Sequence, residues 1–124
     1  MRNALKRVAV PVLRELGFRG SFPHFSRRGP DRIDLLTFQF SLYGPSLYVE
    51  AAECGPEGVT LGDGRRFPPE RVRAHHTASR IRLGRDDRQF EFGPERGPDV
   101  FESNATSIAK LIKEQAEPWW RRDT

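Results

Sequence analysis

The sequence predicts an α+β domain in which an antiparallel β-sheet of four or five strands, arranged as a meander, packs against an N-terminal and a C-terminal helix. Both ends of the chain repeat apolar residues at the spacing of one helix face, and the middle alternates apolar and polar residues. Strands with a single apolar face are typical of antiparallel sheets, and that face must lie on helices. With 124 residues, the chain is expected to form one domain over residues 1–124.

The composition favours a folded domain with a small core and argues against global disorder. Hydrophobic residues make up 36% and charged residues 31%, which favours large solvated faces, while nine Phe, two Trp and two Tyr provide enough aromatic area to close a core. The net charge of +4 comes from 18 Arg and 3 Lys against 17 acidic residues. An arginine excess suits phosphate or carboxylate recognition, and it equally suits a bias in genome base composition. The interleaved acidic residues dilute any basic stripe.

A single cysteine, Cys54, excludes an internal disulfide and a multi-cysteine zinc site, and it fits a reducing compartment. No apolar run reaches the roughly 18 residues of a membrane-spanning helix. Charged residues interrupt the apolar stretch at the start of the chain, so it does not match a secretion signal. A cytoplasmic protein without a membrane partner is expected.

The first segment predicts a helix whose apolar face comprises Leu5, Val8, Ala9, Val12, Leu13 and Leu16. Asn3 is the expected N-cap, and Gly17 is placed to end the helix in a left-handed conformation, with Phe18 folding back on the last turn. Pro11 removes one helical hydrogen bond and predicts a bend.

Three strands are expected next, at residues 24–28, 32–43 and 47–52, with turns at "RGPD" and "YGPS". In the second strand the alternation assigns one set of side chains to the core, namely Leu36, Phe38, Phe40 and Leu42. Thr37, Gln39, Ser41 and Tyr43 then lie on the opposite face, where Tyr48 and Glu50 of the third strand join them.

The region from residue 54 to 73 predicts a long loop with a short helix after Pro68 and Pro69. "SRIRLGR" and "RQFEFG" follow as possible strands, and "GRDD" between them has the character of a hairpin turn. Their periodicity leaves open whether they join the main sheet.

The last segment predicts a second helix. Asp99 and Glu102 have the spacing of a capping box. The inward stripe comprises Phe101, Ala105, Ile108, Leu111, Ile112 and Gln115. Pro118 is expected to end the helix, and since Trp119 and Trp120 cannot share a face, at most one of them should pack fully in the core.

This order of features resembles a bacterial family of small α+β proteins, domain of unknown function 4304. The resemblance rests on "LRELGF" at the end of the first helix, the aromatic spacing of "FPHFSRR", a strand carrying Phe38-Gln39, and a later element with His76, Arg80 and Ile81. It implies a helix, an antiparallel sheet and a closing helix, and it transfers no catalytic residues. Some similar small bacterial proteins accompany secreted toxins as immunity proteins, and the resemblance loosely implies that role.

No motif predicts catalysis, a cofactor or a metal. Neighbouring histidines such as His75 and His76 diverge, so a shared ion would need further ligands. Cys54 lacks the surroundings of a cysteine nucleophile. "GDGRR" lacks the spacing of a phosphate-binding loop, and no GxSxG elbow is present. The chain is therefore not expected to be an enzyme.

The polar face of the predicted sheet is the candidate binding surface, because arginine, tyrosine and glutamine are side chains that protein interfaces favour. The candidate partner-binding residues are Thr37, Gln39, Ser41, Tyr48, Glu50, His76, Arg80 and Arg82. The alternative is an ordinary solvated face with ion pairs such as Arg82 to Glu50.

The sequence thus favours a non-enzymatic module that binds another protein, in its concrete form a cytoplasmic immunity protein that neutralises a toxin domain. The alternative is a nucleic-acid-binding domain that uses the arginine-rich segment 71–88 with aromatic side chains as stacking platforms. Its arginines are Arg71, Arg73, Arg80, Arg82, Arg85 and Arg88. The oligomeric state is not predicted.

Overall fold

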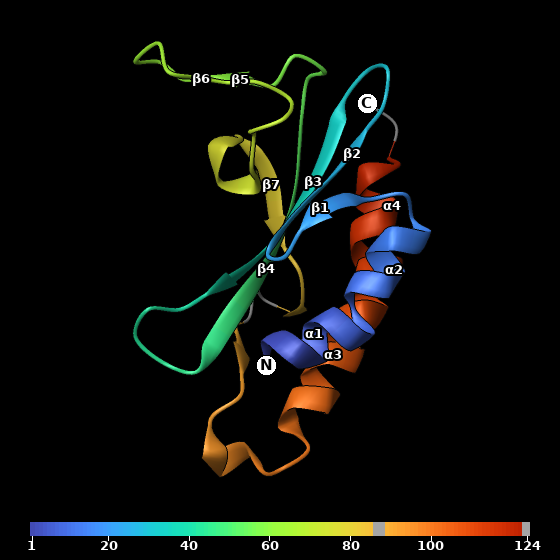
Figure 1. Cartoon of the computed structure of the whole chain (residues 1–124), viewed down its shortest axis with the longest axis vertical. Coiled ribbons are helices and arrows are strands. Elements are labelled where there is room, and N and C mark those ends of the chain that lie inside the picture. The colour runs from blue at the N-terminus through green and yellow to red at the C-terminus, as the bar shows by residue number, and fades with distance from the viewer. Residues whose placement is uncertain (86–88, 123–124) are drawn as a thin grey trace.

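The main sheet is antiparallel and lies against the helices with one of its faces (Figure 1). The computed structural model describes residues 1–85 and 89–122. Within these residues the strand order is β1-β2-β3-β4-β7, and β8 also pairs with β4. The strands of this sheet are β1 (Arg19–Ser21), β2 (His24–Arg28), β3 (Ile33–Phe40), β4 (Ser46–Cys54), β7 (Ser79–Arg82) and β8 (Phe90–Glu91). The predicted α+β arrangement of an antiparallel sheet with N- and C-terminal helices is confirmed.

The N-terminal helix has the predicted break. It consists of α1 (Arg2–Val8) and α2 (Val10–Glu15), which meet at Ala9, two residues before Pro11. The two pieces stay aligned because the Ala9 N–H donates to the Leu5 carbonyl at 2.9 Å. The predicted end is also confirmed, since Gly17 has a φ of 94° and the Phe18 N–H donates to the Leu13 carbonyl at 2.9 Å. The predicted start is wrong: the helix already includes Arg2, so Asn3 is not its N-cap.

The three central strands match the prediction except at their ends. A short strand, β1, precedes them and pairs with β2, and the sequence analysis missed its three residues. β3 stops at Phe40, two residues before Leu42. The predicted core position of Leu42 is therefore wrong, because its side chain is 91% exposed in the turn to β4.

β7 and β8 both join the main sheet, on the edge of β4 that β3 leaves free. Residues 79–82 pair with the second half of β4, and the Leu83 N–H donates to the Val49 carbonyl at 2.8 Å. Phe90 then pairs with Leu47. The two strands thus lie one after the other along β4, and the predicted hairpin between them is wrong. Two residues of its expected turn, Asp86 and Asp87, lie outside the described residues.

The second face of the sheet is partly covered. A small separate hairpin, β5 (Val59–Thr60) with β6 (Arg66–Phe67), leads to a turn that the Val72 N–H closes on the Pro68 carbonyl at 2.9 Å. A 3₁₀ turn, η1 (Ala74–His76), follows. These segments close a small hydrophobic cluster on the second face, made of Ile33, Leu35, Ala52, Val72 and Ala74.

The C-terminal helix runs through Pro118, where the sequence predicted its end. It consists of α3 (Val100–Leu111), a π-helical segment η4 (Ile112–Ala116) and α4 (Glu117–Trp120). A proline is tolerated in the first turn of α4, because its missing N–H and its ring are least disruptive at a helix start. The wider π turn immediately before it already departs from the regular helical hydrogen-bonding pattern.

The predicted capping box of this helix does not form. Asp99 is the N-cap residue, but its side chain makes no capping hydrogen bond. The Glu102 carboxylate instead accepts two hydrogen bonds from Arg7 of α1, at 3.2 and 2.5 Å. Phe101 is 45% exposed, so the predicted inward stripe begins only at Ala105.

The core lies between the helices and the first face of the sheet, and Trp120 is its largest buried side chain. The Trp120 ring lies 4.7 Å from that of Phe18, centroid to centroid, and its Nε1–H donates to the Ala52 carbonyl at 2.9 Å. Trp119 is only half-buried. As predicted, one tryptophan of the pair packs fully in the core.

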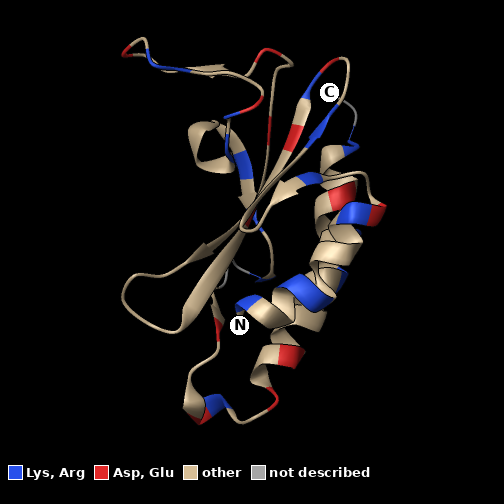
Figure 2. Cartoon of the chain, in the orientation of Figure 1, with Lys and Arg blue, Asp and Glu red and all other residues tan. Residues whose placement is uncertain are grey.

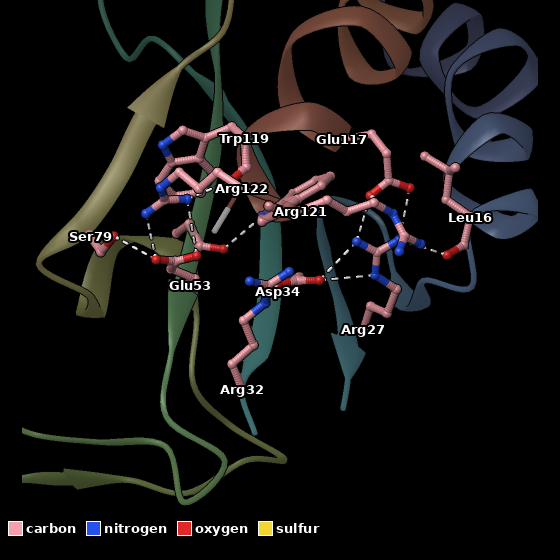
Figure 3. Close-up of polar contacts among 12 residues, drawn as sticks. Leu16, Arg27, Arg32, Asp34, Glu53, Ser79, Glu117, Trp119, Arg121 and Arg122 are labelled. Atoms are coloured by element: carbon pink, nitrogen blue, oxygen red, sulfur yellow. Dashed lines mark hydrogen bonds and ion pairs between the residues drawn. The ribbon is translucent and has the colours of Figure 1, made fainter. Parts of the chain in front are cut away.

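Beside the buried Trp120, acidic and basic residues of α4 and the sheet pair with one another, and Figure 2 shows their positions along the ribbon. Arg27 of β2 lies between two carboxylates, donating to Asp34 at 3.0 and 2.8 Å and to Glu117 at 3.0 and 2.7 Å (Figure 3). It also donates to the Leu16 carbonyl at 3.0 Å. One guanidinium therefore holds together two strands, the end of α2 and the start of α4.

A second ion pair closes the other side of the same region. Arg122 donates to both carboxylate oxygens of Glu53 at 3.2 and 2.7 Å, and the Ser79 hydroxyl donates to the same carboxylate at 3.2 Å (Figure 3). The Arg122 guanidinium also lies 4.2 Å from the centre of the Trp119 ring. Arg122 thus holds the residues that directly follow α4 against β4 and β7.

Replacing Arg27 by Met should lower the free energy of unfolding by about 3 kcal/mol, because it removes the partner that the largely buried carboxylates of Asp34 and Glu117 share, while their pairs with Arg32 and Arg121 remain. Urea denaturation followed by circular dichroism measures the change. Arg28→Met is the matched control on the same strand. Arg28 is exposed, so its replacement should stay within about 0.5 kcal/mol of wild type. Equal effects of the two substitutions would contradict this account of Arg27.

Candidate binding surface

The candidate residues of the second sheet face lie in two adjacent rows. In the first row His24, Thr37, Glu50 and Arg82 stand directly opposite one another across β2, β3, β4 and β7. In the second row Gln39 of β3 faces Tyr48 of β4. The register therefore brings together most of the side chains that the alternation had assigned to this face.

The middle of the first row is buried, contrary to the prediction of an open polar face. Thr37 is 6% and Glu50 4% exposed. The Thr37 hydroxyl is hydrogen-bonded to Nδ1 of His24 at 3.0 Å, and the Glu50 carboxylate lies 3.8 Å from the Arg80 guanidinium. The segment around η1 contacts β3 and β4 here. A rigid partner could not contact Thr37 or Glu50 directly, so both are removed from the candidate binding surface.

The second row remains accessible. Gln39 is exposed and Tyr48 is half-buried. The Arg82 guanidinium lies 3.7 Å from the centre of the Tyr48 ring, a cation–π contact, and the Gln89 amide donates to the Tyr48 hydroxyl at 2.7 Å. Arg82 thus stacks on Tyr48, and the ion pair formed with Glu50 comes from Arg80.

The turn between β3 and β4 extends this row. It projects from the sheet away from the helices (Figure 1), and at its tip Leu42 and Tyr43 are 91% and 96% exposed. Ser41 supports the turn: its N–H donates to the Ser46 carbonyl at 2.9 Å, and its hydroxyl accepts from the Tyr43 N–H at 3.1 Å.

We call Gln39, Leu42, Tyr43, Tyr48 and Arg82 the tip surface. It combines two aromatic rings, an aliphatic side chain, an amide and a guanidinium, and these groups can make apolar contacts and directional hydrogen bonds. Sequence reasoning missed Leu42, because the alternation of apolar residues continues unbroken past the end of β3. The Gly44-Pro45 pair was the available signal that the strand ends early.

The remaining candidates lie elsewhere. The His76 ring stacks on Phe67 with centroids 3.6 Å apart, and its Nδ1 accepts a hydrogen bond from the Arg73 N–H at 3.0 Å. Arg80 is occupied by Glu50. The structure therefore places His76 apart from the tip surface, whereas Arg80 lies on the same sheet face as Arg82, opposite Ala52 and farther from the tip.

The rings of the three histidines lie near one another. The ring of His75 lies 4.2 Å from that of His76 and 6.4 Å from that of His24, centroid to centroid. Among residues 1–85 and 89–122, no group of three or more His, Cys, Asp or Glu side chains is arranged to hold an ion.

Cys54 lies half-buried at the end of β4. Burial, and to a lesser degree the charge of Asp34, raises the pKa of its thiol. A nucleophilic cysteine needs the opposite, a lowered pKa that yields thiolate at neutral pH. The environment of Cys54 is that of a packed thiol.

The arginine-rich segment is divided between two structural settings. Arg71 and Arg73 lie next to the two adjacent histidines, whereas Arg80 and Arg82 belong to β7. Arg85 is exposed, and Arg88 lies outside the described residues. Binding of nucleic acid by this segment stays a prediction. None of the helices described is long and apolar enough to cross a membrane.

The fold and the surface together define a small α+β protein with an antiparallel sheet whose second face is accessible, among the described residues, at the end that carries Gln39 and Tyr48. The chain belongs to the family described as Domain of unknown function (DUF4304), whose model matches residues 9–122. The resemblance noted from the sequence is thereby confirmed. Searches among curated proteins and among solved structures give no match.

The stability of the fold should depend on the protonation of His24. Burial first, and then the charges of Arg73, His75 and His76, lower the pKa of His24 to about 4, from 6.5. The unfolded chain therefore binds this proton more readily, and stability should fall as the pH drops from about 6.5 to about 4. His24→Gln should reduce that fall, as measured by urea midpoints at pH 7 and pH 5. If the urea midpoint falls equally in wild type and His24→Gln between pH 7 and pH 5, His24 is not the group responsible for the loss of stability.

Proposed function

We propose that this protein is a non-enzymatic, cytoplasmic binding module that docks another protein through the tip surface. The observation that carries the proposal is the pair Leu42 and Tyr43, two adjacent large side chains that are almost fully exposed at the end of a projecting turn. Single exposed apolar residues are common on protein surfaces. Two together, at the end of the strands that carry Gln39 and Tyr48, have the composition of the few residues that dominate binding energies.

The rest of the tip surface supports specific recognition. Arg82 and Tyr48 are held in place by their cation–π contact and by the hydrogen bond from Gln89, so they lose little conformational freedom when a partner binds. Gln39, in register with Tyr48, offers an unobstructed amide donor and acceptor. A rigid aromatic and cationic row beside a protruding apolar tip fits a concave surface better than a flat one.

The chemistry of this surface also indicates the kind of partner. It should have an apolar pocket for Leu42 and Tyr43 and a carboxylate opposite Arg82. The net charge of +4 would speed association with an acidic protein. In its concrete form the proposal is an immunity protein, because blocking the active surface of a toxin domain requires tight contact and no chemistry of its own.

The immunity role is tested by co-expressing the protein with the product of the adjacent gene. Complex formation on purification and relief of toxicity are expected. If neither occurs, this form of the proposal fails.

The surface is tested separately with the double substitution Leu42→Ser and Tyr43→Ser. It should weaken the complex by about thirtyfold or more, the loss expected for one binding hot spot. Stability should change by no more than about 0.5 kcal/mol, since both side chains are exposed. Phe101→Ser, which alters an exposed apolar residue on α3, is the matched control and should bind like wild type. Unchanged affinity of the double variant in calorimetry would move the interface away from the tip surface.

A further inference from the structure

A small basic pocket lies on the second face of the molecule, next to the β5–β6 hairpin and apart from the tip surface. Its volume is about 310 Å³, and it is lined by Arg66, Phe67, Arg71, Arg73, His75 and His76. Among the described residues, no carboxylate belongs to this lining. Figure 2 shows basic positions along the hairpin and the chain that follows it. We name this feature the basic pocket.

Local structure fixes the side chains that line the basic pocket. The Arg71 and Val72 N–H groups both donate to the Pro68 carbonyl, at 2.8 and 2.9 Å. Val72 and Ala74 are buried in the hydrophobic cluster of the second sheet face. The alternating residues, Arg71 and Arg73, line the pocket. The same alternation that anchors this segment to the sheet therefore gathers its arginines on one side.

His76 is held so that it offers a hydrogen-bond donor. Its ring stacks on Phe67 with an angle of 15° between the planes, which restricts its rotation. Its Nδ1 accepts a hydrogen bond from the Arg73 N–H. In the neutral ring the hydrogen must then sit on Nε2, the nitrogen that remains free to donate to a ligand.

The basic pocket concentrates positive charge. Among the ion pairs formed by residues 1–85 and 89–122, none involves Arg66, Arg71 or Arg73. The mutual repulsion contributes, after burial, to a lowered pKa of His76. Like charges held together without a counter-ion disfavour the folded state, and a bound anion would offset that repulsion.

We propose that the basic pocket binds the phosphate group of a phosphate monoester. Guanidinium groups bind phosphate oxygens in a bidentate manner, and three arginines with His76 Nε2–H can supply donors to several oxygens at once. The stacked rings of Phe67 and His76 provide a flat wall for the organic part of the ligand. A volume of about 310 Å³ lies near the lower end of the range for ligand pockets.

The test is a titration of ¹⁵N-labelled protein at constant ionic strength, with inorganic phosphate, AMP and phosphoserine in separate arms. Each should cause saturable NMR shifts of the His76 ring and the Arg73 amide. Tighter binding of AMP identifies a nucleotide as the source of the phosphate, and equal binding shows that the phosphate alone is recognised. If none of the three gives a saturable shift, the proposal is overturned.

Variants separate a formed pocket from general attraction by positive charge. Arg71→Gln with Arg73→Gln should weaken phosphate binding at least about tenfold. Arg19→Gln with Arg28→Gln removes the same charge from exposed positions on β1 and β2 and should leave binding unchanged. Equal losses in the two double variants would overturn the proposal. Arg71→Gln alone, at an exposed position, provides a second test if the first double variant is poorly folded.

This proposal does not rest on the proposed function. The variant with Ser at positions 42 and 43 should bind phosphate like wild type, because those residues do not line the basic pocket. Loss of phosphate binding in that variant would show that the two surfaces are not separate and would overturn the assignment to this pocket.

Discussion

The structure depends on one arginine that lies on the helix-side face of the sheet. Arg27 would be costly to bury alone, yet its guanidinium bonds to Asp34, Glu117 and the Leu16 carbonyl and lies 4.7 Å from the centre of the Phe18 ring. These partners come from β3, from α4 and from the end of the first helix pair. The end of α2 and the start of α4 therefore meet at a polar centre, and the fully buried Trp120 packs on Phe18 beside it. The ion pairs of Arg27 and the packing of Trp120 on Phe18 together hold α4 against the sheet.

The two faces of the sheet differ in how much of each is covered. The first face is covered by helices through large apolar side chains, and it accounts for the main core. Among the described residues, the second face is covered at one end, by a small cluster that Val72 and Ala74 complete. This partial cover buries Thr37 and Glu50 and leaves the row of Gln39 open. One strand, β3, thereby serves both as a core strand and as the base of an exposed tip.

Periodicity predicted the helices, the central strands and the core positions of Leu36 and Phe38, because these features follow from local spacing. The failures have non-local causes. Glu102 forms an ion pair with Arg7, 95 residues away, instead of the predicted capping hydrogen bond. β7 and β8 pair with β4 rather than with each other. The burial of Thr37 and Glu50 could not be inferred from their own strands, since the covering segment is rich in glycine, proline and charge. The alternation along the strands predicted which residues belong to the candidate surface. It could not predict which of them are accessible.

The alternation of Arg71, Val72, Arg73 and Ala74 has an evolutionary consequence. A strictly alternating segment that is anchored on one side and lines a pocket on the other has no freedom in its length if both contacts are to be kept. Deleting or inserting one residue between Pro68 and His76 would turn arginines toward the hydrophobic cluster and alanine or valine toward solvent. Substitutions that preserve the alternation remain open to selection. This stretch should therefore keep its length among relatives even where its residues diverge, unlike an ordinary surface loop, in which length is the property that varies most freely.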